Sequence, residues 1–489
     1  MSQPKLTIYE VDGALAALPV GAFYPAFVGV SSTGTVDTPL SFGSKTALTT
    51  AKGYGAVVEL AAAYIEQKGR PCVVVNTGST VAASFGSIDV TGVTGTSVVT
   101  AAAGIDCNDD YEVKVLVSTG CTVGTTGGYL QYSLDGGRTY SPPTALGTDT
   151  SFTIPNSGGV EFDFAAGTLV AGDYFTIRCN APLFNSTELT SALTALRQST
   201  LPVDAVVIVG ELDGTTFDAL TTAIAAFYAA NKPVYFIAST RIPDDGESEG
   251  TYKTALDAIF TSKSSVYGAV GAGACEVTSS ISGRKYRRPA TFAWAPQELA
   301  ADDHDNIAEV SGNALVGVSI ADEYGNPKHH DESINPGLDD SRFVTLRTWE
   351  DRAGVYCNRP RLFSPAGSDF ELIPHRRVMN LARRVLRSYF TLRLSKPVAV
   401  NLTTGFILES EAREIESGAN AALRAALLAT PKASGGGFTN GDFVQISRTD
   451  NLISTKTMTV QGRIVPLAYL EYIDLYLGFY NPALALVAA

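Results

Sequence analysis

The chain has 489 residues, of which 45% are hydrophobic and 17% charged, and its formal net charge at pH 7 is −13. This length and composition exclude a disordered protein and indicate about three globular domains, while the acidic balance argues against general nucleic-acid binding. Lys5 and Glu10 interrupt the N-terminus and no apolar run reaches the ~20 residues of a membrane helix, so we expect no signal peptide, no membrane insertion and synthesis in a cytoplasm.

The beginning of the chain reads as an arm followed by a mixed α/β region. Residues 1–20 have no helical period, and we interpret them as an extended N-terminal arm that carries Leu6 and Ile8. Buried strands are predicted at 23–30 and 71–75. Between them, residues 56–67 follow two glycines and place apolar side chains on one helical face.

A change in composition near Ser79 marks an inserted domain. Gly, Thr, Ser and Val dominate residues 80–181, and no helical period survives there. Alternating strands are predicted, with a hairpin signal at Asp135-Gly136; the strands are 111–117, 128–133, 159–164 and 173–179. We therefore expect an all-β, sandwich-like domain that can be removed without unfolding the rest.

The α/β pattern resumes after the insertion, so we assign 21–79 and 182–372 to one α/β core. Helices are predicted at 216–231 and 252–260. Strands are predicted at 203–210, 233–238, 266–270, 290–295 and 315–320. Such alternation implies a sheet that is covered by helices and at least partly parallel.

A C-terminal α+β domain is assigned to residues 373–477 and opens with a basic helix. Residues 376–396 contain six Arg, one Lys and no acid. We interpret Arg376, Arg383, Arg384 and Arg387 as a docking surface for an acidic partner; a solvated helix face is the alternative. A second helix, 406–428, is acidic in its first turns, which its dipole explains.

The end of the chain is apolar. Residues 472–480 alternate strictly and predict a strand with Leu475, Leu477 and Phe479 on one face. The segment 478–489 follows as a C-terminal arm, which contains Leu484 and Leu486 and nothing polar after Pro482. We interpret it as a segment that is buried in another molecule, because free termini are usually polar.

The sequence offers no catalytic, cofactor-binding or metal site. Phosphate-loop, dinucleotide-loop and nucleophile-elbow spacings are all missing. Of the four histidines, His304 lies among aspartates, and His329 and His330 precede two acids. We interpret both stretches as solvated polar loops, with weak calcium binding at 302–305 as the alternative.

Six cysteines are present without any CxxC pair, which predicts reduced, half-buried thiols. Disulfides formed after release from a cell are the alternative, and they would involve Cys72, Cys107, Cys121 and Cys179.

Taken in order, these features resemble the tail sheath protein of contractile phage tails and related injection machines. The segments that carry the resemblance are 21–30, 201–211, 376–428, 462–466 and 472–482. The resemblance implies an α+β / α/β multidomain fold, in which a sheath core carries an inserted all-β outer domain and extended N- and C-terminal arms. It implies a structural protein and not an enzyme.

The resemblance also implies partners. Sheath subunits form stacked six-membered rings around a tail tube, and their arms add strands to the sheets of neighbouring subunits. On this basis we expect self-assembly, contacts with tube, baseplate and tail terminator proteins, and a place in a virion tail made in a bacterial host. The basic helix would face the tube. Contraction would drive the tube through the host envelope.

Two other classes stay open: an α/β enzyme with a β-sandwich binding accessory, and an adhesin or surface-layer protein.

Overall fold

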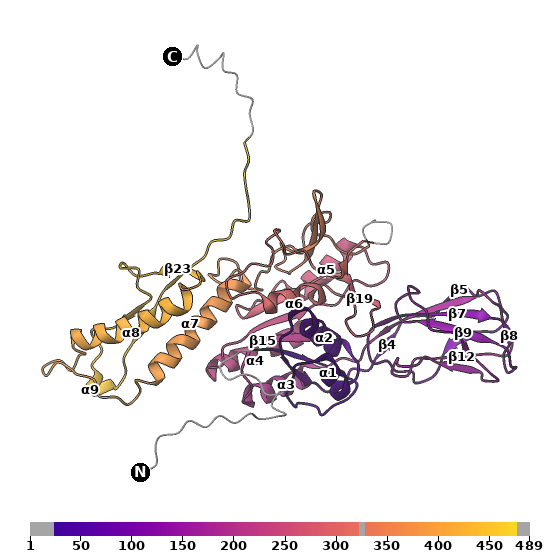
Figure 1. Ribbon diagram of the computed structural model, residues 1–489, viewed down its shortest axis with the longest axis horizontal. Coiled ribbons are helices and arrows are strands. Elements are labelled where there is room, and N and C mark those ends of the chain that lie inside the picture. Colours follow the sequence, from indigo (N-terminus) through magenta and orange to yellow (C-terminus); the bar gives the residue numbers. More distant parts are fainter. Residues whose placement is uncertain (1–23, 322–327, 477–489) are drawn as a thin grey trace, which may run out of the picture. The chain divides into compact units, whose positions relative to one another are not determined.

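A six-stranded sheet forms the centre of the first of two compact units, which divide between Arg384 and Val385. The computed structural model describes residues 24–321 and 328–476 (Figure 1). The strand order is β17-β16-β15-β1-β3-β2, and all pairs are parallel except β2 with β3. The strands are β1 (Tyr24–Gly29), β2 (Leu40–Phe42), β3 (Cys72–Asn76), β15 (Val203–Glu211), β16 (Tyr235–Ser239) and β17 (Gly268–Gly271).

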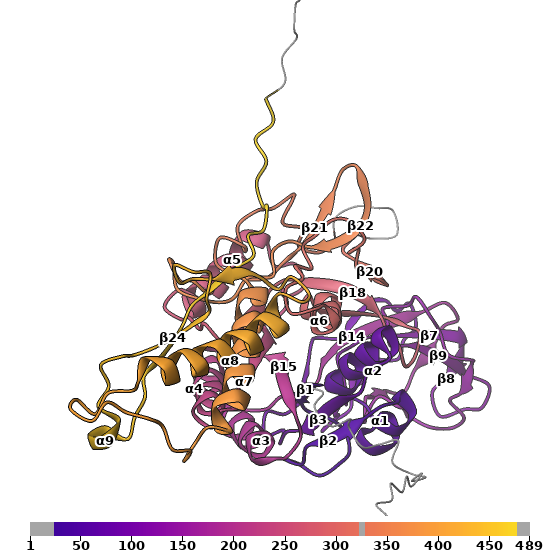
Figure 2. The same ribbon diagram turned by 60° about the vertical axis from the view of Figure 1, so that its left-hand side comes forward.

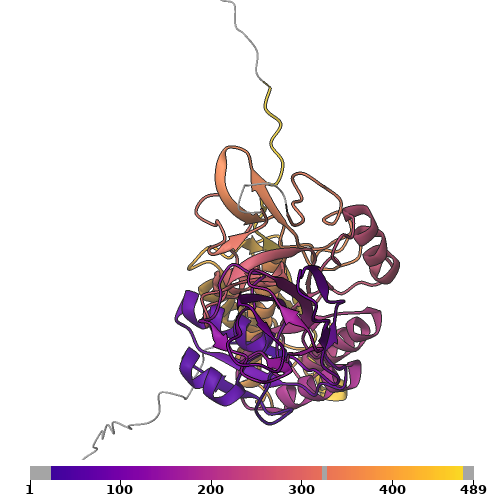
Figure 3. The ribbon, with the colours of Figure 1, turned by 90° about the vertical axis from the view of Figure 1, so that its right-hand side faces the viewer.

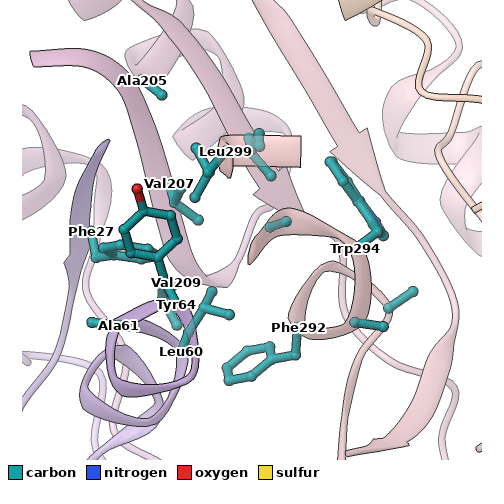
Figure 4. Packing of buried hydrophobic residues seen from close by; sticks show 14 of the residues in the cluster. Phe27, Leu60, Ala61, Tyr64, Ala205, Val207, Val209, Phe292, Trp294 and Leu299 are labelled. Carbon is teal, nitrogen blue, oxygen red and sulfur yellow. The ribbon is translucent and has the colours of Figure 1, made fainter. Parts of the chain in front are cut away.

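Helices cover both faces of this sheet (Figure 2). One face packs on α1 (Lys45–Lys52), α2 (Ala56–Lys68) and α6 (Thr291–Ala300). The other packs on α3 (Ser186–Gln198), α4 (Gly214–Ala229) and α5 (Glu249–Phe260). Figure 4 shows the first face, where Phe27 of β1 meets Tyr64 of α2 with ring centroids 5.8 Å apart. The predicted doubly covered α/β core is therefore present.

Local sequence signals set the ends of several helices. Asn185 and Asp213 cap α3 and α4 with complete capping boxes, in which Glu188 and Thr216 bond back to the cap. Gly69 ends α2 in the left-handed region at φ 60°, where glycine is unstrained. Among the described residues, no helix is both long and apolar enough to span a bilayer.

The prediction of a strand at 290–295 is wrong, because this segment begins helix α6. Phe292 and Trp294 are both buried, Trp294 completely. A short apolar run that is buried on all sides carries no periodicity to separate strand from helix. The predicted strand at 315–320 reduces to β20 (Val318–Ser319).

Residues 84–180 form a β-sandwich, with its strands nearest the viewer in Figure 3. Its larger sheet has the order β10-β9-β7-β14-β4, with β5 also on β14, and faces the sheet β11-β12-β6; β8 and β13 pair separately. Phe162 and Phe175 meet between the two layers at 4.9 Å. The strands are β4 (Ser84–Phe85), β5 (Asp89–Gly92), β6 (Val99–Ala101), β7 (Tyr111–Thr119), β8 (Cys121–Thr122), β9 (Tyr129–Ser133), β10 (Thr144–Ala145), β11 (Ser151–Thr153), β12 (Glu161–Phe164), β13 (Thr168–Leu169) and β14 (Tyr174–Asn180).

The sandwich is seated on the core by charged pairs. The core hairpin β18 (Ala274–Thr278) and β19 (Lys285–Pro289) contributes Tyr286 to the hydrophobic cluster of the sandwich. Ion pairs of both polarities join the two, among them Arg178–Asp245 at 2.9 Å, Asp109–Arg288 at 2.7 Å, and Arg138–Glu276. The insertion is thus fixed by polar contacts as well as by its two connections to the chain.

The rest of the first unit contains a second hairpin, β21 (Leu346–Trp349) with β22 (Arg352–Cys357), and the beginning of α7 (Ile373–Thr391). The second unit holds the end of α7, α8 (Glu409–Leu427), the short α9 (Leu452–Thr455) and four strands. These are β23 (Ala433–Gly436), β24 (Val444–Ile446), β25 (Val460–Gly462) and β26 (Ile464–Pro466).

Candidate assembly surfaces

The carboxyl ends of β1 and β15 are where a doubly wound sheet would hold a ligand, because the strand order reverses between them. The base of the insertion packs beside the end of β1. A Cβ built on Gly55 would lie 2.9 Å from the Val30 carbonyl and 3.4 Å from the Asn108 carbonyl of the insertion. At the end of β15, a Cβ built on Gly210 would lie 2.7 Å from the Phe184 ring.

Acidic groups gather beside this position and surround one arginine. Arg288 is 2% exposed and contacts Asp109 at 2.7 Å and Asp110 at 3.5 Å. Burial raises the pKa of Glu59 nearby, while Arg288 and a hydrogen bond from Ser279 lower it. Burial and Asp110 raise the pKa of Glu211 to about 6. Both carboxyls lie beside the internal ion pair of Arg288, so their raised pKa values have a structural cause.

The prediction of a solvated loop at His329 and His330 is wrong. His330 is 3% exposed, and its two ring nitrogens lie 2.8 Å from Glu249 and 2.9 Å from Glu332. Burial acts to lower its pKa, but the hydrogen bonds with both carboxylates dominate and raise the pKa to about 9. The residue is a charged clamp between the start of α5 and the loop after residue 327. Within 24–321 and 328–476, no group of three or more His, Cys, Asp or Glu side chains could hold a metal.

The first turns of the basic helix α7 are buried, so the prediction that Arg376 lies on an exposed face of this helix is wrong. Arg376 and Arg377 are each 6% exposed. Arg376 donates to the Val266 carbonyl at 2.8 Å and lies over Phe370, while Arg377 pairs with Glu298 at 3.0 Å. We therefore remove Arg376 from the predicted docking surface, because its guanidinium stacks inside the first unit.

The other three predicted docking arginines are placed differently. Arg383 is exposed, yet one guanidinium nitrogen donates to the Tyr228 carbonyl at 2.9 Å. Arg384 is half-buried, and Arg387 is exposed in the second unit. Asn380 lies between the arginine pairs and bonds the Tyr228 hydroxyl at 2.7 Å, so this face of α7 is anchored by Tyr228.

The cysteines are free thiols, and five of the six are buried. Cys72 lies in the core, while Cys107 and Cys179 lie inside the sandwich, where Cys107 donates to the Asn180 carbonyl at 3.2 Å. Burial, with a contribution from Asp110, raises the pKa of Cys179 to about 12. Crosslinks between subunits require accessible thiolates, so only half-buried Cys121 keeps a position suited to them.

The second unit contains a strand pair with one uncovered edge. β23 and β24 both pair with the segment 460–466, β24 with β25 and β23 with β26. Arg463 donates to the Phe443 carbonyl at 2.8 Å and accepts from Gly437 at 3.0 Å, so both partners lie on the same side and residues 437–443 bulge out between them. On the opposite side of 460–466, no described residue forms a ladder.

An exposed apolar segment follows this strand. Leu470, Tyr472 and Leu475 are 81%, 82% and 74% exposed. The predicted strand at 472–480 is not formed in its described part, 472–476, which has no regular structure. Leu477, Phe479, Leu484 and Leu486, and likewise Leu6 and Ile8, lie outside the described residues.

Comparisons with known proteins agree with this architecture. The family model described as DUF2586, N-terminal domain, matches residues 3–361. A search of curated protein sequences finds no match. Among solved structures, the PVC sheath complex of an extracellular contractile injection system in its contracted state is similar at 12% identity and a TM-score of 0.52, over 98% of this chain and 98% of that one.

The anti-feeding prophage baseplate, 6-fold symmetrised, also contains a similar chain. The identity is 12% and the TM-score 0.52, over 98% of this chain and 100% of that one. The sheath tail protein of Listeria innocua is 12% identical over 91% of this chain and 92% of that one, with a TM-score of 0.49. The PVC and anti-feeding prophage structures show that the chain has the fold of contractile sheath proteins, which confirms the resemblance stated from the sequence.

Proposed function

The chain belongs to the DUF2586 family and shares its fold with contractile sheath proteins, and from this we propose that it is a structural subunit of a contractile sheath. In this proposal, six copies form a ring, rings stack around a tail tube, and contraction drives the tube through a host envelope. Tube, baseplate and tail terminator proteins are the partners. In the same proposal, the inserted domain at 80–181 lies on the outside of the sheath.

One observation carries the proposal: among the described residues, an uncovered strand edge and an exposed apolar segment occur in the same unit. The edge at 460–466 exposes backbone donors and acceptors, which in a monomer invites pairing with another chain. The segment 470–476 offers apolar side chains that are largely exposed, among them Leu470, Tyr472 and Leu475. Strand addition between copies satisfies both features.

The alternatives gain less support. An enzyme of this topology would keep the ends of β1 and β15 accessible, whereas the insertion packs beside the end of β1. The buried, paired state of His330 and Arg288 gives their charges a structural role.

A truncation tests the proposal. Deleting 478–489 should leave a folded, soluble monomer that no longer forms long sheaths, because the strand and arm that join subunits are lost. Electron microscopy and sedimentation of the purified protein measure this. A matched control is Asp474→Ser, which changes the polar face of the adjoining segment 470–476 and leaves 478–489 in place.

The proposal is wrong if the truncated chain still polymerises into full-length tubes. Flat lattices of the intact chain would indicate a surface layer, and isolated particles under all conditions would favour an enzyme.

A further inference from the structure

The outer edge of β24, on the side away from β25, is already occupied by side chains of α8. Asn420 is 6% exposed, and its Oδ1 accepts from the backbone N–H of Phe443 at 2.7 Å and of Val444 at 3.0 Å. Its Nδ2 donates to the Val444 carbonyl at 3.3 Å. One amide side chain thus replaces the donor and acceptor that a neighbouring strand would supply.

Glu416 continues this pattern one helical turn earlier. Its Oε1 accepts from the Ile446 N–H at 2.7 Å. Residues four apart on a helix are separated by about 6 Å along its axis, close to the ~6.7 Å between alternate residues of a strand. Glu416 and Asn420 therefore match the spacing of the outward-facing amides of Val444 and Ile446.

Arg448 holds Glu416 in this position. Its guanidinium contacts both carboxylate oxygens of Glu416, at 2.7 and 2.8 Å, and its Nε bonds Glu409 at 2.7 Å. The hydrogen bond from Arg448 is the main cause that lowers the pKa of Glu416, so this carboxylate stays ionised and keeps its acceptor capacity. A bidentate pair also restricts the side chain geometrically.

We propose that Asn420 and Glu416 are an edge guard, which closes β24 so that the sheet accepts a strand of a second copy only along 460–466. This inference rests on the proposed strand addition, and it names the residues that determine which edge of the sheet accepts the added strand. Without the guard the sheet would have two open edges, and subunits could pair in two registers and two orientations.

The surface beside the guard reinforces the choice of edge. A groove of about 700 Å³ runs along α8 and is lined by charged side chains. Arg424 pairs with Asp442 at 2.9 Å, and Arg413 pairs with Glu409 of the same helix at 2.6 Å. An incoming apolar strand would have to strip water from these charges. The edge at 460–466 carries Ile464 and Val465 instead, which suit an apolar strand.

Amide hydrogen exchange separates the two edges. In the intact chain, the amides of Val444 and Ile446 should already be protected in the monomer, and assembly should add protection only at 460–466. In the double variant Asn420→Ala/Glu416→Ala, the amides of Val444 and Ile446 should exchange roughly tenfold or more faster in the monomer. They should become protected in polymers that are irregular by electron microscopy.

Two further variants complete the design. Ser417→Ala lies on the same exposed helix turn and should behave like the intact chain. Glu416→Gln retains the acceptor oxygen, so it should keep the edge closed even if the double variant does not fold. Normal exchange of the Ile446 amide in this variant supports the edge guard. Rapid exchange of that amide would mean that the guard requires the charge pair with Arg448.

The outcomes distinguish the two proposals. If the intact chain assembles without added protection at 460–466, the proposed strand addition fails. If that protection appears but the double variant builds the same regular polymers with Val444 and Ile446 still exchanging freely, the edge guard fails alone.

Discussion

His330 illustrates how a single side chain can make stability depend on pH. It is enclosed by the carboxylates of Glu249 and Glu332, and the backbone N–H groups of Gly337 and Asp339 bond the latter. The imidazolium therefore joins α5 to the loop after residue 327. Its neutral form would leave two carboxylates facing one another without a cation, so the charged form is favoured in the folded state.

We expect His330→Gln to lower the free energy of unfolding by about 2–3 kcal/mol at pH 6, as a shift in pKa of this size implies. The folded pKa of about 9 lies above the unfolded value near 6.5. The stabilisation is therefore complete below pH 6.5 and is lost as pH rises through 9. Urea unfolding of both proteins at pH 6, 8 and 10 measures it, and a difference that stayed constant across this range would contradict the assignment.

At the scale of elements, the contacts of the insertion change what its removal should do. The sequence predicts a module that can be exchanged for a linker. The structure places Arg288 and Asp109, each 2% exposed, in one ion pair between module and core. Removing the module leaves the guanidinium of Arg288 buried without its main partners, and breaking such a pair from one side costs about 3–5 kcal/mol.

Replacing 79–181 by a short Gly/Ser linker should therefore destabilise the core, and adding Arg288→Met should recover much of that loss. Thermal unfolding of both deletion variants tests this. Arg284→Met in the deletion background is the control, because Arg284 lies in the same region but outside the three pairs. Equal melting temperatures for the Arg288 and Arg284 variants would show that the ion pair of Arg288 contributes nothing to the stability of the core.

The elements that the sequence predicts well are those with a clear period or alternation. β7, β12 and β14 alternate buried with more exposed residues over several positions, and α4 carries a clear apolar stripe. Helix α6 fails because Phe292 and Trp294 are buried on every side. Helices α1 and α3 were not predicted, although Asn185 and Glu188 form a capping signal that identifies the start of α3.

The assembly surfaces were only partly predictable. The burial of Arg376 and Arg377 depends in part on Tyr267 and Glu298, which are remote in sequence. The burial of Asn420 has a signal in the sequence, because this polar residue lies beside Ala419 on the inward-facing stripe of α8. Its bonds to residues 443 and 444 follow from a turn geometry that a single sequence does not contain.

For the molecule as a whole, the distribution of charge argues for a tube-facing role of the remaining exposed arginines. The chain is strongly acidic, yet α7 contains no acid from Ile373 to Thr391. Exposed pairs contribute at most about 1 kcal/mol each, but a ring multiplies them by the number of its subunits. Screening by salt should then control assembly on an acidic tube.

Reversing Arg383, Arg384 and Arg387 to Glu should impair assembly on the tube, most clearly at low salt, where the attraction is least screened. Co-sedimentation with purified tube measures this. Arg413→Glu is the matched control, because its side chain is 75% exposed on α8 and lies outside the proposed docking set. Unchanged assembly of the triple variant at low salt would remove α7 from the tube interface.

The packing at the ends of β1 and β15 has a consequence for how such a sheath would be powered. The insertion crowds the end of β1, where a doubly wound sheet would bind a nucleotide. In the proposed sheath, energy would instead be stored once, during assembly, and released once. How long that energy stays stored would then depend on the height of an activation barrier and not on any continuing supply of energy.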